Sequence, residues 1–298
     1  MNRQKVFLEM METLIGKQIN FEDIIGQSKD ALEENCAKLS SEVGNPFEVN
    51  LDGEAKEPCP FCCSSMDKPF DLVWVGLNPG KPLEQCKGLF SWKNTTWQEL
   101  VDFCVPTSDI RENEKNIYHH LKDSEYYKFL LRMHTALTTD KIYNTWDELK
   151  NNHADVEKFF VEHFAKYSIL NADLVPYKSN TTTFNAKKLL DDESYGNYFR
   201  KLIQFIEQET KPDAWIIFYG ARPEVQKLLN KFAPDWNVPD KNLYIKIDGH
   251  TKGNHFCLFN KGRRKILLAP FLISGQNTSP LYYNLNPLID AMKELENK

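Results

Sequence analysis

Four short stretches of the chain carry an almost continuous run of apolar side chains bounded by turn-forming residues. They lie at residues 71–77, 167–175, 214–219 and 265–271. An apolar run of this length without alternation is typical of a β-strand that is buried on both faces of a sheet. We therefore predict four buried strands at these positions.

Apolar residues at helical spacing fill much of the remaining sequence. The pattern occupies residues 5–40, 195–209 and 223–232, together with most of 95–165. Strands that alternate with helices favour right-handed crossovers, which produce a parallel sheet covered by helices on both faces. Residues 243–260 instead indicate an additional hairpin, with Asp248-Gly249 as its turn.

The predicted fold is a three-layer α/β/α domain around a central four-stranded parallel sheet. Residues 1–66 form an N-terminal helical and turn-rich extension, and residues 67–298 form the α/β domain. A helical insertion at about 95–165 separates the first predicted strand from the second. With 298 residues, of which 41% are hydrophobic, the chain is long enough for one large core.

Composition and charge indicate which kinds of partner, membrane or nucleic acid, this chain could bind. The longest apolar run, at about 266–273, is far shorter than the roughly 20 residues that span a bilayer, and no secretion signal is visible, so we expect no membrane contact and a cytoplasmic location. We also expect a monomer. A net charge of −5 argues against a protein that coats nucleic acid indiscriminately. Residues 241–265 are locally basic, however, because seven Lys and Arg residues accompany the single carboxylate Asp248.

The end of the first predicted strand carries the most distinctive motif, Gly76-Leu77-Asn78-Pro79-Gly80-Lys81-Pro82. Ligands of open parallel sheets bind beyond the carboxyl ends of the strands, where loops and helix N-termini converge. A phosphate-binding P-loop needs four residues between its glycines and a Ser or Thr after the lysine. Here three residues separate Gly76 from Gly80, and Pro82 offers no magnesium ligand, so the motif is a poor match to an NTPase.

The segment Gly76-Leu77-Asn78-Pro79-Gly80 resembles the first active-site motif of the uracil-DNA glycosylase superfamily, in the form found in its mismatch-specific and single-strand-selective branches. Four further segments resemble that superfamily in the same order along the chain. They are Gly88-Leu89-Phe90-Ser91, Ile169-Leu170-Asn171-Ala172-Asp173-Leu174-Val175, Trp215-Ile216-Ile217-Phe218-Tyr219-Gly220 and Asn277-Thr278-Ser279-Pro280. The resemblance spans roughly residues 70–290 and implies a uracil-DNA-glycosylase-like fold.

The resemblance also implies an activity, hydrolysis of the N-glycosidic bond of uracil or a related damaged base in DNA. Asn78 would position the attacking water, and Asn277 would donate to the departing base as negative charge grows on it. The implied substrate-binding residues are Gly76, Leu77, Pro79, Gly80, Phe90, Asn171 and Ser279. Thr278 stands where the second motif usually has proline, and another register would place that motif at Pro270-Phe271.

Three of these residues also have a structural interpretation. Asn78 could shape the turn before Pro79, Asn171 could bond backbone within a buried strand, and Phe90 could be a core side chain. Two other functions stay open on the same scaffold. One is a nucleic-acid or nucleobase binding module that has lost efficient cleavage, and the other is an enzyme acting on a free nucleoside.

A basic run lies between the fourth and fifth of the resembling segments, at residues 261–265. Its residues Lys261, Arg263, Arg264 and Lys265 are expected near the same edge as the proposed site. Cations there would hold phosphates while a base is rotated out of the stack. The alternative is an ordinary solvated turn.

Seven cysteines without a secretion signal are interpreted as reduced thiols or metal ligands. Cys59-Pro60-Phe61-Cys62 lies just ahead of the first motif, where one branch of the resembling superfamily has the first two ligands of a four-iron cluster. Cys86 and Cys104 are candidates for the remaining pair, although both come much sooner after Cys62 than that branch requires. We favour unligated thiols and no cofactor. An iron–sulfur cluster or a zinc ion held by these cysteines stays an open alternative.

Overall fold

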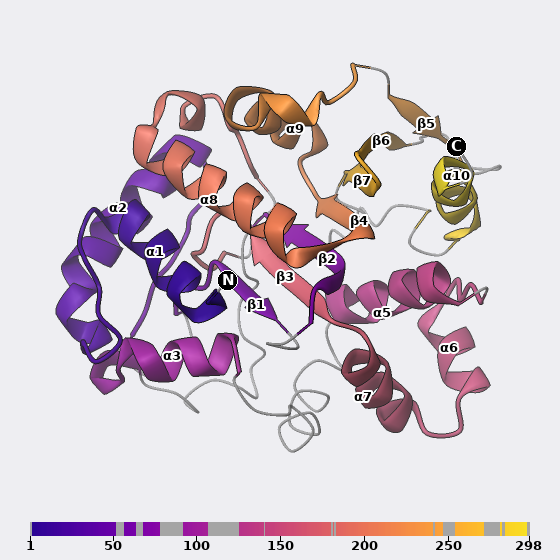
Figure 1. The fold of residues 1–298 in the computed structure, drawn as a ribbon, viewed down its shortest axis with the longest axis horizontal. Helices are drawn as coiled ribbons and strands as arrows, with labels where there is room; N and C mark the ends of the chain where they lie inside the picture. The colour runs from indigo at the N-terminus through magenta and orange to yellow at the C-terminus, as the bar shows by residue number, and fades with distance from the viewer. Residues whose placement is uncertain are drawn as a thin grey trace.

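A seven-stranded mixed sheet forms the centre of the computed structural model (Figure 1). The structure describes residues 2–51, 57–63, 68–77, 92–106, 125–139, 141–179, 181, 183–240, 242–246, 254–270, 281 and 284–296. Within these ranges the strands are β1 (Phe61–Cys63), β2 (Phe70–Gly76), β3 (Ile169–Asp173), β4 (Thr210–Tyr219), β5 (Leu243–Ile245), β6 (Asn254–Lys261) and β7 (Arg264–Ala269). Their order across the sheet is β1-β3-β2-β4-β7-β6-β5.

The four central strands are parallel. β2 lies between β3 and β4, with Trp74 opposite Asn171 on one side and Ile217 on the other, and β7 pairs with the far side of β4. These strands coincide with the four apolar runs of the sequence. Their carboxyl ends therefore share one edge, at Gly76, Asp173, Tyr219 and Ala269.

The predicted total of four strands is wrong, because three antiparallel strands extend the sheet. β1 pairs with β3, while β6 pairs with both β7 and β5. β6 turns into β7 through Gly262, whose φ of 60° lies in the left-handed region that glycine adopts without steric cost. The hairpin predicted at residues 243–260 is thus part of the main sheet, and its Asp248-Gly249 turn lies outside the described residues.

Helices cover both faces of the sheet, so the domain has the predicted three layers (Figure 1). β2 shows why both faces are apolar, since Val73 and Val75 enter one core and Leu72 and Trp74 enter the other. One layer contains α1 (Arg3–Ile15), α2 (Lys29–Val43), α3 (Trp97–Cys104), α8 (Glu193–Glu209) and α9 (Arg222–Phe232). The other contains α5 (Glu125–Thr138) and α10 (Asn286–Glu296), and α6 (Trp146–Asn152) and α7 (Val156–Lys166) follow α5 in sequence.

The N-terminal helices share the core of the sheet. Phe7 on α1 is fully buried, and its ring contacts Phe61 of β1 at 5.6 Å between centroids. Arg3 Nε also donates to Glu209 Oε2 of α8 over 2.8 Å. The N-terminal helices, which were predicted as part of an extension over residues 1–66, are therefore packed against the α/β domain predicted for residues 67–298. Within the described ranges no helix combines the length and the apolar character needed to cross a membrane.

A pair of buried histidines joins α5 to α7. His134 Nδ1 and His163 Nε2 are hydrogen-bonded, and His134 also packs edge-on against Tyr167. Burial lowers the pKa of His163 to about 4, with Lys166 contributing, and burial and His163 together hold the pKa of His134 well below its usual range. Both rings are therefore neutral in the folded protein near pH 7.

We predict that the free energy of unfolding falls as the pH drops below 6.5. An unfolded histidine titrates near 6.5, so between that pH and about 4 the unfolded chain binds a proton that folded His163 excludes. For His163 alone the loss between pH 7 and pH 5 is about 2 kcal/mol. Urea unfolding at both pH values measures it. His163→Gln should reduce the loss, whereas the exposed His255→Gln should not, and equal pH dependence in all three proteins would contradict the prediction.

Candidate functional site at the carboxyl edge of the sheet

The last residues of β2 are fixed to the segment that follows β3. The amide of Leu174 donates to the Gly76 carbonyl, and that of Val175 donates to the Leu77 carbonyl, each over 3.0 Å. Leu77 is buried. The structure thus places Gly76 and Leu77 at the carboxyl edge, as predicted. Six other predicted site residues lie outside the described ranges, namely Asn78, Pro79, Gly80, Phe90, Asn277 and Ser279.

Asn171 is the predicted base-reading residue that the structure describes. It lies on β3 beside Trp74 of β2, and its side chain is half-buried. The Tyr126 hydroxyl of α5 faces Asn171 Oδ1 at 3.5 Å, a long hydrogen bond. An asparagine side chain has two N–H donors and one carbonyl acceptor, so this single long bond leaves it able to form further hydrogen bonds.

An aromatic wall stands beside Asn171, formed by Trp74, Tyr126, Phe129 and Tyr219. The Trp74 ring lies 5.3 Å from that of Tyr219 and 6.0 Å from that of Tyr126, between centroids. Phe129 approaches Trp74 and Tyr219 from α5 at 6.1 and 5.8 Å. Trp74, Phe129 and Tyr219 are buried in the hydrophobic core on this face of the sheet, so the wall borders Asn171 on its core side.

Asp173 is a candidate residue that the sequence analysis missed. It ends β3 opposite Gly76, so close that a Cβ atom on Gly76 would lie 2.9 Å from Asp173 Oδ1. Burial raises the pKa of this carboxyl well above its usual range; the nearby Cys62 adds to the rise and Lys178 opposes it. The sequence does contain a signal for this residue, because Asp173 is a carboxylate at the end of an apolar run. Buried acids with a shifted pKa are found more often at functional sites.

Two tyrosines of α8 hold the backbone beyond β3 in place. The Tyr198 hydroxyl donates to the Asp173 carbonyl over 2.6 Å, and the Tyr195 hydroxyl donates to the Leu174 carbonyl over 3.1 Å. Burial raises the pKa of both phenols, so they remain donors at neutral pH. These bonds tie the backbone at the end of β3 and just beyond it to α8.

Three of the four candidate metal-binding cysteines meet beside Asp173. The Sγ atoms of Cys59, Cys62 and Cys104 all lie within 4.8 Å of one another, with Cys59 3.3 Å from Cys62 and 3.6 Å from Cys104. Hydrogen bonds from Cys104 and then Cys59 lower the pKa of the Cys62 thiol well below its usual range. The fourth candidate, Cys86, lies outside the described residues.

The expectation that the basic run lies at the same edge as Gly76 is wrong. Lys265 pairs with Trp215 at the amino end of β7, four residues before Ala269 and therefore roughly 13 Å from the carboxyl edge. Arg263 lies in the turn that precedes β7, and Arg264 donates to the Thr210 carbonyl over 3.1 Å. Lys261 forms an ion pair of 2.5 Å with Asp235. Whether these cations bind nucleic acid stays a prediction.

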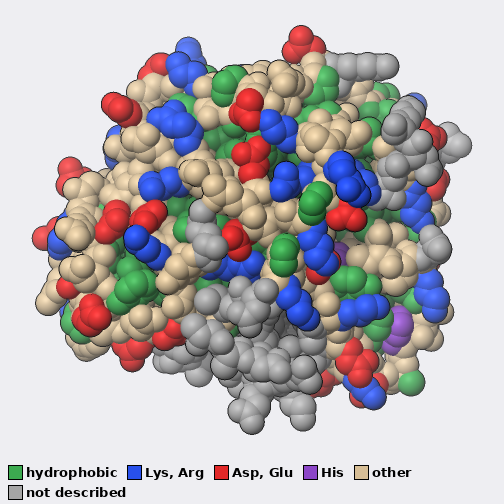
Figure 2. Space-filling model, in the orientation of Figure 1, with side chains coloured by type: hydrophobic (Ala, Val, Ile, Leu, Met, Phe, Trp, Pro, Cys, Tyr) green, Lys and Arg blue, Asp and Glu red, His purple; other side chains and the backbone are tan. Residues whose placement is uncertain are grey.

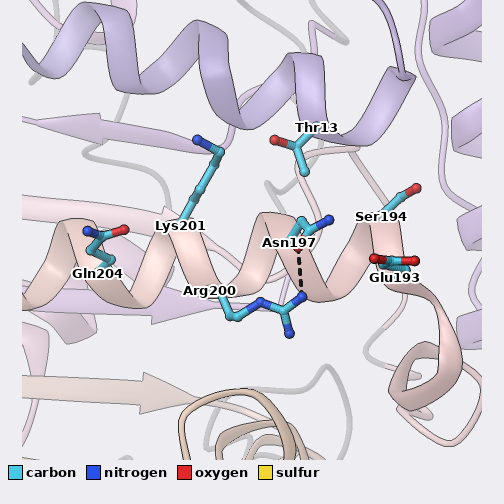
Figure 3. A pocket seen from close by; sticks show the side chains of 7 residues that line it. All are labelled: Thr13, Glu193, Ser194, Asn197, Arg200, Lys201 and Gln204. Carbon is cyan, nitrogen blue, oxygen red and sulfur yellow. Dashed lines mark hydrogen bonds between the residues drawn. The ribbon is translucent and has the colours of Figure 1, made fainter.

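The surface shown in Figure 2 carries Lys and Arg side chains interspersed with Asp and Glu. A groove of about 500 Å³ lies between α1 and α8 (Figure 3). Its lining is polar, with Thr13 from α1 and Glu193, Asn197, Arg200 and Lys201 among the residues from α8. None of the predicted site residues lines it, so it is separate from the carboxyl edge of the sheet.

No protein-family model matches this chain, and no curated protein or solved structure matches it. Function must therefore be inferred from the chemistry of the carboxyl edge itself.

We predict that Gly76→Ala costs less than about 1 kcal/mol in the free energy of unfolding, because the one close contact of the new methyl group among the described residues is the end of the Asp173 side chain, which can rotate away. Gly26→Ala is the contrast. Its Cβ would lie 2.4 Å from the Lys93 backbone oxygen, which cannot rotate away, and we expect a loss of about 1–3 kcal/mol. Urea unfolding compares the two variants, and an equal loss would mean that the Asp173 carboxyl is rigidly held.

Proposed function

We propose that this protein is a DNA glycosylase that hydrolyses the N-glycosidic bond of uracil or a related damaged base. The observation that carries the proposal is the convergence at one edge of the sheet. The end of the Gly76-Leu77 motif, the Asn171 amide and the aromatic wall all meet where the parallel strands end. In open α/β sheets this edge is where ligands bind.

Base recognition would fall to Asn171, with the buried aromatic wall supporting it from the core side. A uracil edge presents a donor and acceptors, which a single amide can match with its own nitrogen and oxygen. A base that lacks this pattern would leave the amide unpaired in a partly buried site, which is costly. The half-buried position of Asn171 beside Trp74 and Tyr126 supports this role. Phe90, as the superfamily resemblance implies, would stack on the extracted base.

The bond-breaking step would use Asn78, which follows Leu77 directly in the sequence. Cleavage of the N-glycosidic bond develops positive charge on the sugar and negative charge on the base. An amide cannot act as a strong base, but its oxygen can orient a water molecule toward the sugar carbon. Asn277 would donate to the base as negative charge accumulates on it. Catalysis would then rest on positioning and electrostatics, with water as the nucleophile.

We predict that Asn78→Ala reduces the rate of uracil excision roughly 100-fold or more, since it removes the group that positions the water. Asn171→Ala should reduce the rate at least about tenfold and weaken the preference for uracil over cytosine. Single-turnover excision from single-stranded and G·U-mismatched oligonucleotides measures both effects. Asn197→Ala changes an exposed asparagine in the groove of α8 and should retain full activity.

A wild-type protein that binds these oligonucleotides but leaves the uracil in place after long incubation would contradict the glycosylase proposal. That result would favour a diverged binding module on the same scaffold. Loss of activity in Asn197→Ala equal to that in Asn78→Ala would instead place the site at the groove. Thermal melts of all four proteins separate these outcomes from misfolding.

A further inference from the structure

The cysteine cluster joins two segments that are distant in sequence. Cys59 precedes β1, Cys62 lies within it, and Cys104 is the last residue of α3. We propose that these three thiolates bind one zinc ion, in a site that does not depend on the glycosylase proposal. Zinc takes cysteine thiolates readily and binds them in tetrahedral geometry.

The sulfur spacing fits a single ion. With a zinc–sulfur bond of about 2.3 Å and tetrahedral angles, two ligand sulfurs on one ion lie about 3.8 Å apart. The observed 3.3 and 3.6 Å, with all three sulfurs within 4.8 Å, need only small adjustments to reach that value. A disulfide would require about 2.05 Å, so neither pair is bonded.

The same spacing does not fit the four-iron cluster that the superfamily resemblance raised. In such a cluster each thiolate binds a different iron atom, so the ligand sulfurs stand on the order of 6 Å apart. All three sulfurs here are closer than 4.8 Å. The third ligand also comes from α3, ahead of β3, and much sooner after Cys62 than the cluster-containing branch requires.

The surrounding backbone holds the three residues in place before any metal binds. The Cys59 amide donates to the Pro176 carbonyl over 2.8 Å, and Cys62 pairs with Asn171 across β1 and β3. The start of α3 has a capping box between Thr96 and Glu99. Cys59 and Cys104 are 6% and 2% exposed, so water would compete weakly for the ion. Such preorganisation favours metal binding because little ordering entropy is lost.

One charged pair lies near the three thiols. Lys178 is buried and forms an ion pair of 3.0 Å with Glu57. Among the described residues no histidine, further cysteine or carboxylate completes the set. Three protein ligands leave the fourth position of a tetrahedral zinc ion to another ligand. The ion would tie α3 to β1 directly beside Asp173.

The test is metal content and ligation in the full-length protein. Protein purified without chelator should contain about one zinc per chain by mass spectrometry. Cobalt exchanged into the wild-type protein should give an intense thiolate-to-metal absorption band with tetrahedral d–d bands. Removal of zinc with a chelator should lower the melting temperature, since the ion crosslinks two elements.

Matched variants identify the ligands. Cys59→Ser, Cys62→Ser and Cys104→Ser should each lose most of the zinc, while Cys63→Ser, next to Cys62 on β1, and Cys257→Ser on β6 should retain it. The cobalt spectrum of the wild-type protein decides the matter if the ligand variants fail to fold. The proposal is overturned by four irons with sulfide per chain, by protein that binds neither zinc nor cobalt, or by zinc that survives the triple Cys59, Cys62 and Cys104 substitution.

Discussion

The parallel pairing of β2 between β3 and β4 is the interaction on which the rest of the molecule depends. β2 has a neighbour on each side and a hydrophobic core on each face, so it sits at the point of greatest burial. Its backbone groups have no access to water and must pair along the strand. That requirement fixes the register of Trp74 against Asn171 and Ile217. The register in turn brings Gly76 and Asp173 to the same level.

Several polar side chains lie at or near the carboxyl edge of the sheet, next to the hydrophobic core. Asp173, Asn171 and the three thiols lie within a few residues of fully buried aromatic side chains. Buried polar groups are costly unless they are paired, and here the hydroxyls of Tyr195 and Tyr198 donate to the Leu174 and Asp173 carbonyls. This concentration of chemistry distinguishes the carboxyl edge from the polar groove on α8.

The sequence predicted the central strands and most helices because their signal is local. A run such as residues 71–77 is typical of a strand buried on both faces, and the structure confirms it as β2. β1 was not predicted, because its three residues are too few to show a periodic pattern. The meeting of Cys104 with Cys59 is a long-range contact that no local pattern encodes. Lys265 was misplaced by its nearness in sequence to the last motif, although residues that precede a parallel strand lie at its amino end.

The shortness of β1 and β5 has a consequence for how copies of this chain can associate. Each outermost strand of the sheet is three residues long, so few backbone donors and acceptors are exposed at either border of the described structure. Long unpaired borders invite strands of other molecules and lead to aggregation or exchange of segments. At these two borders the described strands therefore offer little template for such growth.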